Sequence, residues 1–144
     1  MQATYKEIRT LIRNVWPGLK HVWLRDTKYW LPRLFDVQFA IKHTRIEIMS
    51  YFDAIHDCDD YALQFQAQTN KWRYGIANQG LLKQDEMYQW PLGQVLGTVF
   101  RDKHELHNCN IVVTDDWIVR LIEPQTDEIW IANKDHDEVF MIFV

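Results

Sequence analysis

The sequence has little of several features that would assign a protein to a class at once. It holds only two cysteines among 144 residues. These are too few for the disulfide framework of a small secreted protein, so both thiols are expected to be reduced. No apolar run is long enough to cross a bilayer, and the first residues lack the apolar block of a signal peptide. We therefore expect a soluble protein in the cytoplasm of the cell that makes it.

Positive charge is also scarce. Sixteen Lys and Arg residues are outnumbered by 20 Asp and Glu residues, which gives a formal net charge of −4. No basic cluster stands out that could neutralise nucleic-acid phosphates or anionic lipids. The composition argues against nucleic acid and membranes as partners and leaves a protein or peptide substrate, or a structural protein partner. It does not indicate an oligomeric state.

Apolar residues, by contrast, are plentiful. Hydrophobic residues make up 47% of the chain and aromatic residues 14%, which is enough for one core in a chain of this length. We expect a single domain over residues 1–144. Its helical part spans about residues 1–75 and its β part about residues 95–144.

The first half shows the three- and four-residue apolar spacing of helices. The third predicted helix starts at Asp57 or Cys58 and is stopped by Gly75, and the segment 46–51 fits either a strand or a continuation of the preceding helix. Two short extended segments are expected to pair with each other near the first helix. The predicted helices cover residues 5–16, 36–44 and 57–75, and the two short segments cover residues 21–24 and 29–32.

After a predicted long loop over residues 76–94, the pattern changes to short segments rich in Val, Ile, Phe and Trp. Turns that contain Asp or Asn separate them. Helices followed by an antiparallel sheet define an α+β domain. The predicted strands cover residues 95–100, 110–114, 117–123, 128–133 and 138–144.

One predicted hairpin places a histidine next to a carboxylate. A three-residue turn at 114–116 sets His107 opposite Glu123, whereas a two-residue turn sets His107 opposite Pro124 and leaves Glu123 as a diagonal neighbour. A carboxylate beside an imidazole fixes the ring's tautomer and raises its basicity. The other pairs of the first register are Val113 with Trp117, Ile111 with Val119, and Cys109 with Leu121.

Cys58 is the candidate nucleophile. The free N–H groups and the dipole at a helix N-terminus stabilise a thiolate there. Asp57, Asp59 and Asp60 oppose ionisation of the same thiol. The alternative is a small structural cysteine at a capped helix start.

Several motifs give the chain a resemblance to a known family. They are Asp57-Cys58-Asp59-Asp60-Tyr61-Ala62, a His-x-x-Asn at His107 and Asn110, Leu121-Ile122-Glu123-Pro124-Gln125-Thr126, and Asp26-x-x-Tyr29-x-Leu31-Pro32. Over about residues 20–130 the chain resembles the C-terminal domain of the mushroom agglutinin family and its bacterial and phage relatives. The resemblance implies a papain-like cysteine-protease fold, with N-terminal helices packed on a C-terminal antiparallel sheet. It also implies calcium-dependent cysteine-protease (thiol protease) activity.

The resemblance also implies roles for individual residues. Cys58 would be the nucleophile, His107 the general base and Glu123 the residue that orients His107, which together form a catalytic triad. Asp59 and Asp60 are the candidate calcium ligands, because carboxylate oxygens suit that ion. The candidates for substrate binding are Asn110 and Trp90. The family's sugar-binding β-trefoil has no counterpart here, so the resemblance implies no lectin activity.

Three positions depart from the family pattern. Leu106 replaces a glycine before the histidine, and Asn108 replaces a small residue after it. Phe52 stands where papain-type enzymes place an oxyanion-hole glutamine, a loss that typically costs roughly 100- to 1000-fold in rate. The leading interpretation is a papain-like cysteine hydrolase that acts on peptide or amide bonds. The alternative is a catalytically weak or inactive fold that serves as a protein-binding or phage structural module, with virion association if the chain comes from a phage.

Overall fold

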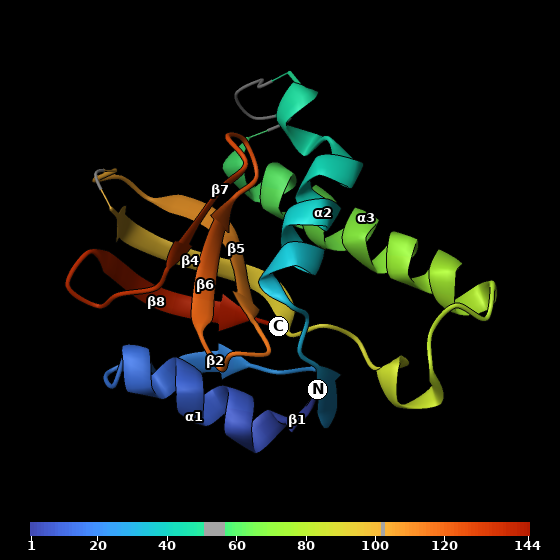
Figure 1. The fold of residues 1–144 in the computed structure, drawn as a ribbon. Coiled ribbons are helices and arrows are strands. Elements are labelled where there is room, and N and C mark those ends of the chain that lie inside the picture. The colour runs from blue at the N-terminus through green and yellow to red at the C-terminus, as the bar shows by residue number, and fades with distance from the viewer. Residues whose placement is uncertain (51–56, 102) are drawn as a thin grey trace.

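The computed structural model describes residues 1–50, 57–101 and 103–144, which form an α+β domain. A six-stranded sheet separates helix α1 from helices α2 and α3, as Figure 1 shows. The α+β fold class predicted from the sequence is confirmed. No helix in the described part of the chain is long and apolar enough to cross a membrane.

Helix α1 (Tyr5–Val15) forms as its apolar spacing predicts. Thr4 caps it, since the Thr4 hydroxyl accepts from the Glu7 N–H at 3.4 Å and the Thr4 N–H donates to the Glu7 carboxylate at 2.7 Å. Ile8 and Ile12 are fully buried beneath it. The helix ends just before Pro17, which cannot continue the hydrogen-bond pattern.

Helix α2 (Leu34–Thr44) begins two residues earlier than predicted. Asp36 does not occupy the N-cap position. It lies in the first turn, where its carboxylate accepts from the Arg33 N–H at 3.1 Å. The segment after it is neither a strand nor an α-helical continuation in its described part, because η1 (Ile46–Ile48) is a single 3-10 turn that follows Arg45 in a left-handed conformation.

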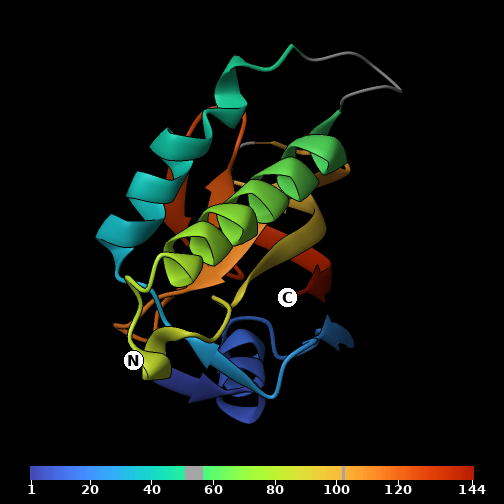
Figure 2. The ribbon, with the colours of Figure 1, turned by 90° about the vertical axis from the view of Figure 1, so that its right-hand side faces the viewer.

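Helix α3 (Cys58–Asn78) begins where the sequence predicts, with Asp57 as its N-cap. It continues three residues beyond Gly75, the predicted stop, and the chain turns away at Gly80, whose φ is +70°. Figures 1 and 2 both show α2 and α3 side by side on one face of the sheet. The buried side chains of α3 belong to Tyr61, Ala62, Phe65, Gln66, Thr69 and Arg73.

The loop between α3 and the sheet is shorter than the predicted 76–94, because the helix covers its start and a strand covers its end. It contains the 3-10 turn η2 (Gln84–Glu86). The buried guanidinium of Arg73 donates to the carbonyls of Glu86 at 2.9 Å and Tyr88 at 2.8 Å. One side chain of α3 therefore fastens the loop.

The main sheet has the strand order β2-β8-β4-β5-β6-β7. All of its neighbours are antiparallel except β2 and β8, which run parallel. The strands are β2 (His21–Trp23), β4 (Leu92–Phe100), β5 (His107–Val113), β6 (Val119–Glu123), β7 (Glu128–Ile131) and β8 (Asp137–Phe143).

The two short N-terminal strands do not pair with each other, so that part of the prediction is wrong. β2 joins β8 in the main sheet, while β3 (Lys28–Trp30) pairs with β1 (Gln2–Thr4). Val22 of β2 is buried against the main core and Tyr29 of β3 is 1% exposed. Each strand therefore buries more apolar surface with a distant partner than a local hairpin would offer.

The register of the β5–β6 hairpin differs from both predicted versions. Val113 lies opposite Val119 and Ile111 opposite Leu121, a shift of two residues from the first version. The turn is longer than predicted because Trp117 takes a left-handed conformation, with φ of +60°, and belongs to the turn. A shift of two leaves each side chain on its predicted face, since strand side chains alternate with a period of two.

Both faces of this hairpin are covered. One face packs on α1 and the other on α2 and α3, so Asn110, Val112 and Arg120 are buried as well as Ile111 and Leu121. The two cores are centred on Ile8, Ile12, Cys109, Ile111 and Leu121 on one face, and on Phe65, Trp90, Val112 and Ile122 on the other.

Candidate functional site

Cys58, His107 and Glu123 each lie at the end of an element. Cys58 is the first residue of α3, His107 the first of β5 and Glu123 the last of β6. Asn110 fastens α3 to the sheet, because its side-chain N–H₂ donates to the Ala62 carbonyl at 2.8 Å. The N-terminus of α3 therefore lies beside the open end of the β5–β6 hairpin.

Hydrogen bonds link these side chains in a row. Nε2 of His107 lies 2.6 Å from Oε2 of Glu123, and the two side chains are only 7% and 4% exposed. Cys58 forms a side-chain hydrogen bond with His107. Since Glu123 occupies Nε2, Nδ1 is the ring nitrogen left for the sulfur. One imidazole therefore joins the thiol to the carboxylate.

The surroundings of His107 favour its protonated form. Burial alone would lower the pKa of His107, but the hydrogen bonds to Cys58 and Glu123 outweigh it and raise the pKa to about 9. Burial likewise opposes ionisation of Glu123, yet hydrogen bonds from His107 and Lys103 hold the pKa of Glu123 below its ordinary value. At neutral pH the pair is therefore an imidazolium and a carboxylate.

Lys103 is a neighbour of this site that the sequence reasoning missed. Its Nζ lies 2.8 Å from Oε2 of Glu123, the same oxygen that contacts His107. The other oxygen, Oε1, accepts from the backbone N–H of Gln125 at 3.4 Å. Lys103 lies in a polar segment that reads as an exposed loop and belongs to none of the motifs, so no pattern in the sequence indicated it.

A cavity opens beside these groups. It measures about 320 Å³ and is lined by Cys58, Lys103, Glu105, Leu106, His107 and Gln125. Leu106, which replaces the family's glycine, is 68% exposed. The thiol and the imidazole therefore face a space that a small ligand can enter, with a mostly polar lining.

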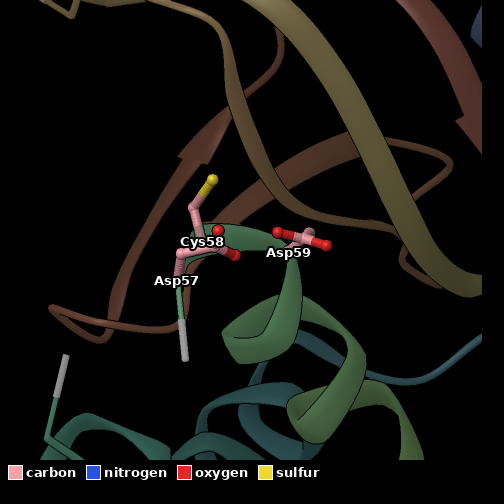
Figure 3. Close-up of side chains that lie close together, drawn as sticks. All are labelled: Asp57, Cys58 and Asp59. Atoms are coloured by element: carbon pink, nitrogen blue, oxygen red, sulfur yellow. The ribbon is translucent and has the colours of Figure 1, made fainter. Parts of the chain in front are cut away.

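The carboxylates around Cys58 have local roles. Asp60 accepts from the Asp57 N–H at 3.3 Å, as in a capping box. A side-chain hydrogen bond between Asp57 and Asp59 lowers the pKa of Asp57 and raises that of Asp59. Figure 3 shows the Cys58 sulfur and the Asp59 carboxylate pointing in different directions from the first turn of α3.

Asp57, Cys58 and Asp59 present possible ligand atoms within 4.8 Å of one another. Helix capping and the hydrogen bond between the two carboxylates account for this arrangement without an ion. Calcium at Asp59 and Asp60 stays a prediction from the family resemblance. Phe52, at the expected oxyanion-hole position, lies outside the described residues.

Asn110 and Trp90, the predicted substrate-binding residues, do not line this cavity. Asn110 is fully buried, and its side-chain N–H₂ also donates to the Gly93 carbonyl at 2.9 Å. Trp90 is 4% exposed and packs edge-on against Trp72. Both side chains have structural contacts, and their role toward a ligand stays a prediction.

A larger hollow of about 730 Å³ lies between the end of α2 and the outer face of α3, away from Cys58. Its lining includes His43, Gln64, Lys71 and Trp72. None of the residues singled out from the sequence lies in it.

No protein-family model and no curated protein matches the sequence. Solved structures do match it. One, titled "PSL1a-E64 complex", superposes with a TM-score of 0.78 at 18% sequence identity and covers 99% of this chain. Another, Polyporus squamosus lectin bound to the epitope Neu5Aca2-6Galb1-4GlcNAc, gives a TM-score of 0.76, also at 18% identity and 99% coverage. The chain spans about half of each of these structures, 51% and 49%.

These structures share the fold of this chain. The resemblance to a mushroom agglutinin is thereby confirmed at the level of fold, while the comparisons include no bacterial or phage relative and do not confirm a papain-like classification.

The comparisons correct the predicted activity. The second match is a lectin with a bound carbohydrate epitope, and neither title describes a protease. The assignment as a cysteine protease or hydrolase with a catalytic triad is therefore wrong by this comparison, and a binding protein fits it better. The sequence analysis had also left carbohydrate out of the expected partners.

Proposed function

We propose that this chain is a ligand-binding module whose site is the cavity beside Cys58, and that the Cys58 thiol is the nucleophile of that site. The observation that carries the proposal is the row of hydrogen bonds from Cys58 through His107 to Glu123 at the edge of an open cavity. In this proposal His107 takes the proton of the thiol and Glu123 orients the ring.

Charge supports a reactive thiol. A protonated His107 next to the sulfur stabilises a thiolate, and the N-terminus of the 21-residue helix α3 adds its positive dipole end. Asp57 and Asp59 act against it from the same turn. The buried ion pair of His107 and Glu123 is closer to full burial than these carboxylates, so its field is less screened by water.

The order of the elements supports the papain-like description at the level of a proposal. The cysteine begins a helix, and the histidine and the carboxylate follow on neighbouring strands. The fold shared with a lectin supports binding as the function of the module. The cavity volume of about 320 Å³ lies at the small end of ligand sites, which favours a compact polar ligand.

Alkylation by iodoacetamide tests the thiol. We expect Cys58 to be alkylated at pH 6 at least about tenfold faster than an ordinary thiol of pKa about 8.5, because part of it is already thiolate. Peptide mass mapping identifies the modified residue, and the fully buried Cys109 serves as the internal control. Glu123→Gln should slow the reaction, since an amide orients the ring without stabilising its charge. If Cys58 reacts only at alkaline pH, the proposed nucleophile is wrong.

The same experiment with and without calcium tests the implied cofactor. A change in the alkylation rate that is lost in Asp59→Asn would support calcium at Asp59. Equal rates at millimolar calcium would count against it.

The compounds named in the titles of the matching structures test binding. We expect E64 to bind to this chain, measured by calorimetry, and Cys58→Ser to weaken it. The trisaccharide of the lectin structure is the second arm, with chemical-shift mapping to locate it. Shifts confined to residues outside the Cys58 cavity for both compounds would contradict this site.

A further inference from the structure

We infer that Lys103 is a positioning residue of the Cys58 site, where its ammonium group holds Glu123 through the oxygen that also binds His107. The inference rests on the proposed function of this site. Nζ of Lys103 and Nε2 of His107 lie 2.8 Å and 2.6 Å from Oε2, and the Gln125 N–H approaches Oε1. Both oxygens of the buried carboxylate therefore have donors, which fixes its orientation toward the imidazole.

The backbone places Lys103 independently of the hairpin. Lys103 and Phe100 exchange two backbone hydrogen bonds of 3.0 Å. Between them, Arg101 takes a left-handed conformation with φ of +53°, and its N–H donates to the His136 carbonyl at 2.8 Å. A tight turn at the end of β4 therefore presents the ammonium group to the last residue of β6.

Lys103 also limits how firmly Glu123 holds the proton on His107. Two cations share one carboxylate oxygen, so each weakens the attraction that the carboxylate offers to the other. The positive charge of Lys103 lowers the pKa of His107, against the larger raising effects of Cys58 and Glu123. The consequence for the site is a proton that His107 keeps at neutral pH but releases more readily than it would beside Glu123 alone.

Other charged groups face the same region. Glu105 shares the Cys58 cavity with Lys103, while Arg101 and Glu128 line a neighbouring cavity of about 200 Å³ that Lys103 and Glu123 also border. These groups are exposed, and Lys103 alone among them has an ion pair with Glu123 in the described part of the chain. Lys103 therefore separates two openings and contacts the buried carboxylate from between them.

The test is a titration of the His107 ring by NMR in four proteins. They are the wild type, Lys103→Met, which removes the charge at similar length, Lys103→Arg, which keeps the charge, and Lys6→Met. Lys6 is exposed on α1 and has no ion pair among the described residues, so its variant has the same net-charge change elsewhere.

We expect Lys103→Met to raise the pKa of His107 by roughly half a unit, a modest shift because Lys103 is 44% exposed and its charge is screened. Lys103→Arg should restore the wild-type titration, and Lys6→Met should leave it unchanged. The same titration in Lys103→Met as in the wild type would overturn the inference, as would an equal shift in Lys6→Met.

Alkylation of Cys58 in the same variants separates this inference from the proposed function. If Cys58 behaves as an ordinary thiol in the wild type while Lys103→Met still shifts His107, the nucleophile is wrong and the positioning role of Lys103 stands. If Cys58 is reactive and His107 does not shift, the reverse holds.

Discussion

The two ends of the β5–β6 hairpin use similar groups to different effect. At the turn, the guanidinium of Arg120 binds both oxygens of Asp116 at 2.8 and 2.7 Å and also donates to Thr114. At the open end, the carboxylate of Glu123 binds His107 and Lys103. Each end pairs a carboxylate with cations, but the carboxylate of Asp116 is 44% exposed and that of Glu123 is 4% exposed.

The difference lies in which group can change its charge. Arg120 stays protonated at all ordinary pH values, so the turn end has one state and a structural role. His107 can release its proton near pH 9 and contacts a thiol beside a cavity. A similar ion pair therefore stabilises one end and supplies chemistry at the other.

The turn end should dominate stability. Arg120→Met removes a guanidinium that is only 6% exposed together with its bonds to Thr114 and Asp116. We expect a loss of about 2 to 4 kcal/mol in the free energy of unfolding, measured with urea, because the buried partner groups lose their hydrogen bonds. Cys58 alkylation in the folded variant should match the wild type, and a tenfold fall would show that the two ends are coupled.

The open end should show itself through pH. The pKa of His107 in the folded protein, about 9, exceeds the ordinary value of about 6.5 in the unfolded chain. Its contribution to stability is therefore complete below pH 6.5 and is lost as the pH rises through 9.

Between pH 7 and 10 we expect the wild type to lose on the order of 1 to 3 kcal/mol through this group. His107→Gln should flatten this part of the stability curve, measured by urea unfolding at each pH. Cys58→Ser is the control for titration of the thiol. An equally steep loss in His107→Gln would assign the effect to other groups.

The smallest effect is expected from the exposed carboxylate at the turn. Asp116→Asn keeps an oxygen acceptor for Arg120 and removes a charge that water already screens, so we expect a loss of at most about 1 kcal/mol. The same measurement of unfolding in urea applies. A loss as large as that of Arg120→Met would mean that the ion pair, and not the burial of Arg120, stabilises the turn.

The sequence predicts local elements well where the cause is local. The start of α3 follows from the capping residue Asp57, and the end of α1 follows from Pro17. Pairing is predicted less well, because it depends on distant partners: nothing near His21–Trp23 indicates that Met141–Phe143 will pair with it. The left-handed Trp117 likewise moved a register that short-range turn rules had placed two residues away.

The candidate site shows the same division. The contact between His107 and Glu123 survived the register error, because a shift of two residues changes the opposing pair but not the face. Lys103 could not be found in this way, since its position depends on the turn with Phe100. Asn110 matches a family motif, yet its burial beneath α3 follows from the sheet having both faces covered.

The parallel pairing of β2 with β8 has a consequence for the time course of folding. It joins residues 21–23 to residues 141–143, which are 120 positions apart, and β8 in turn forms the neighbour of β4. Contacts between such distant segments cost chain entropy before they return any energy, and they slow folding. Until β8 docks, both β2 and β4 present unpaired backbone edges, so the partly folded chain is the state most exposed to aggregation.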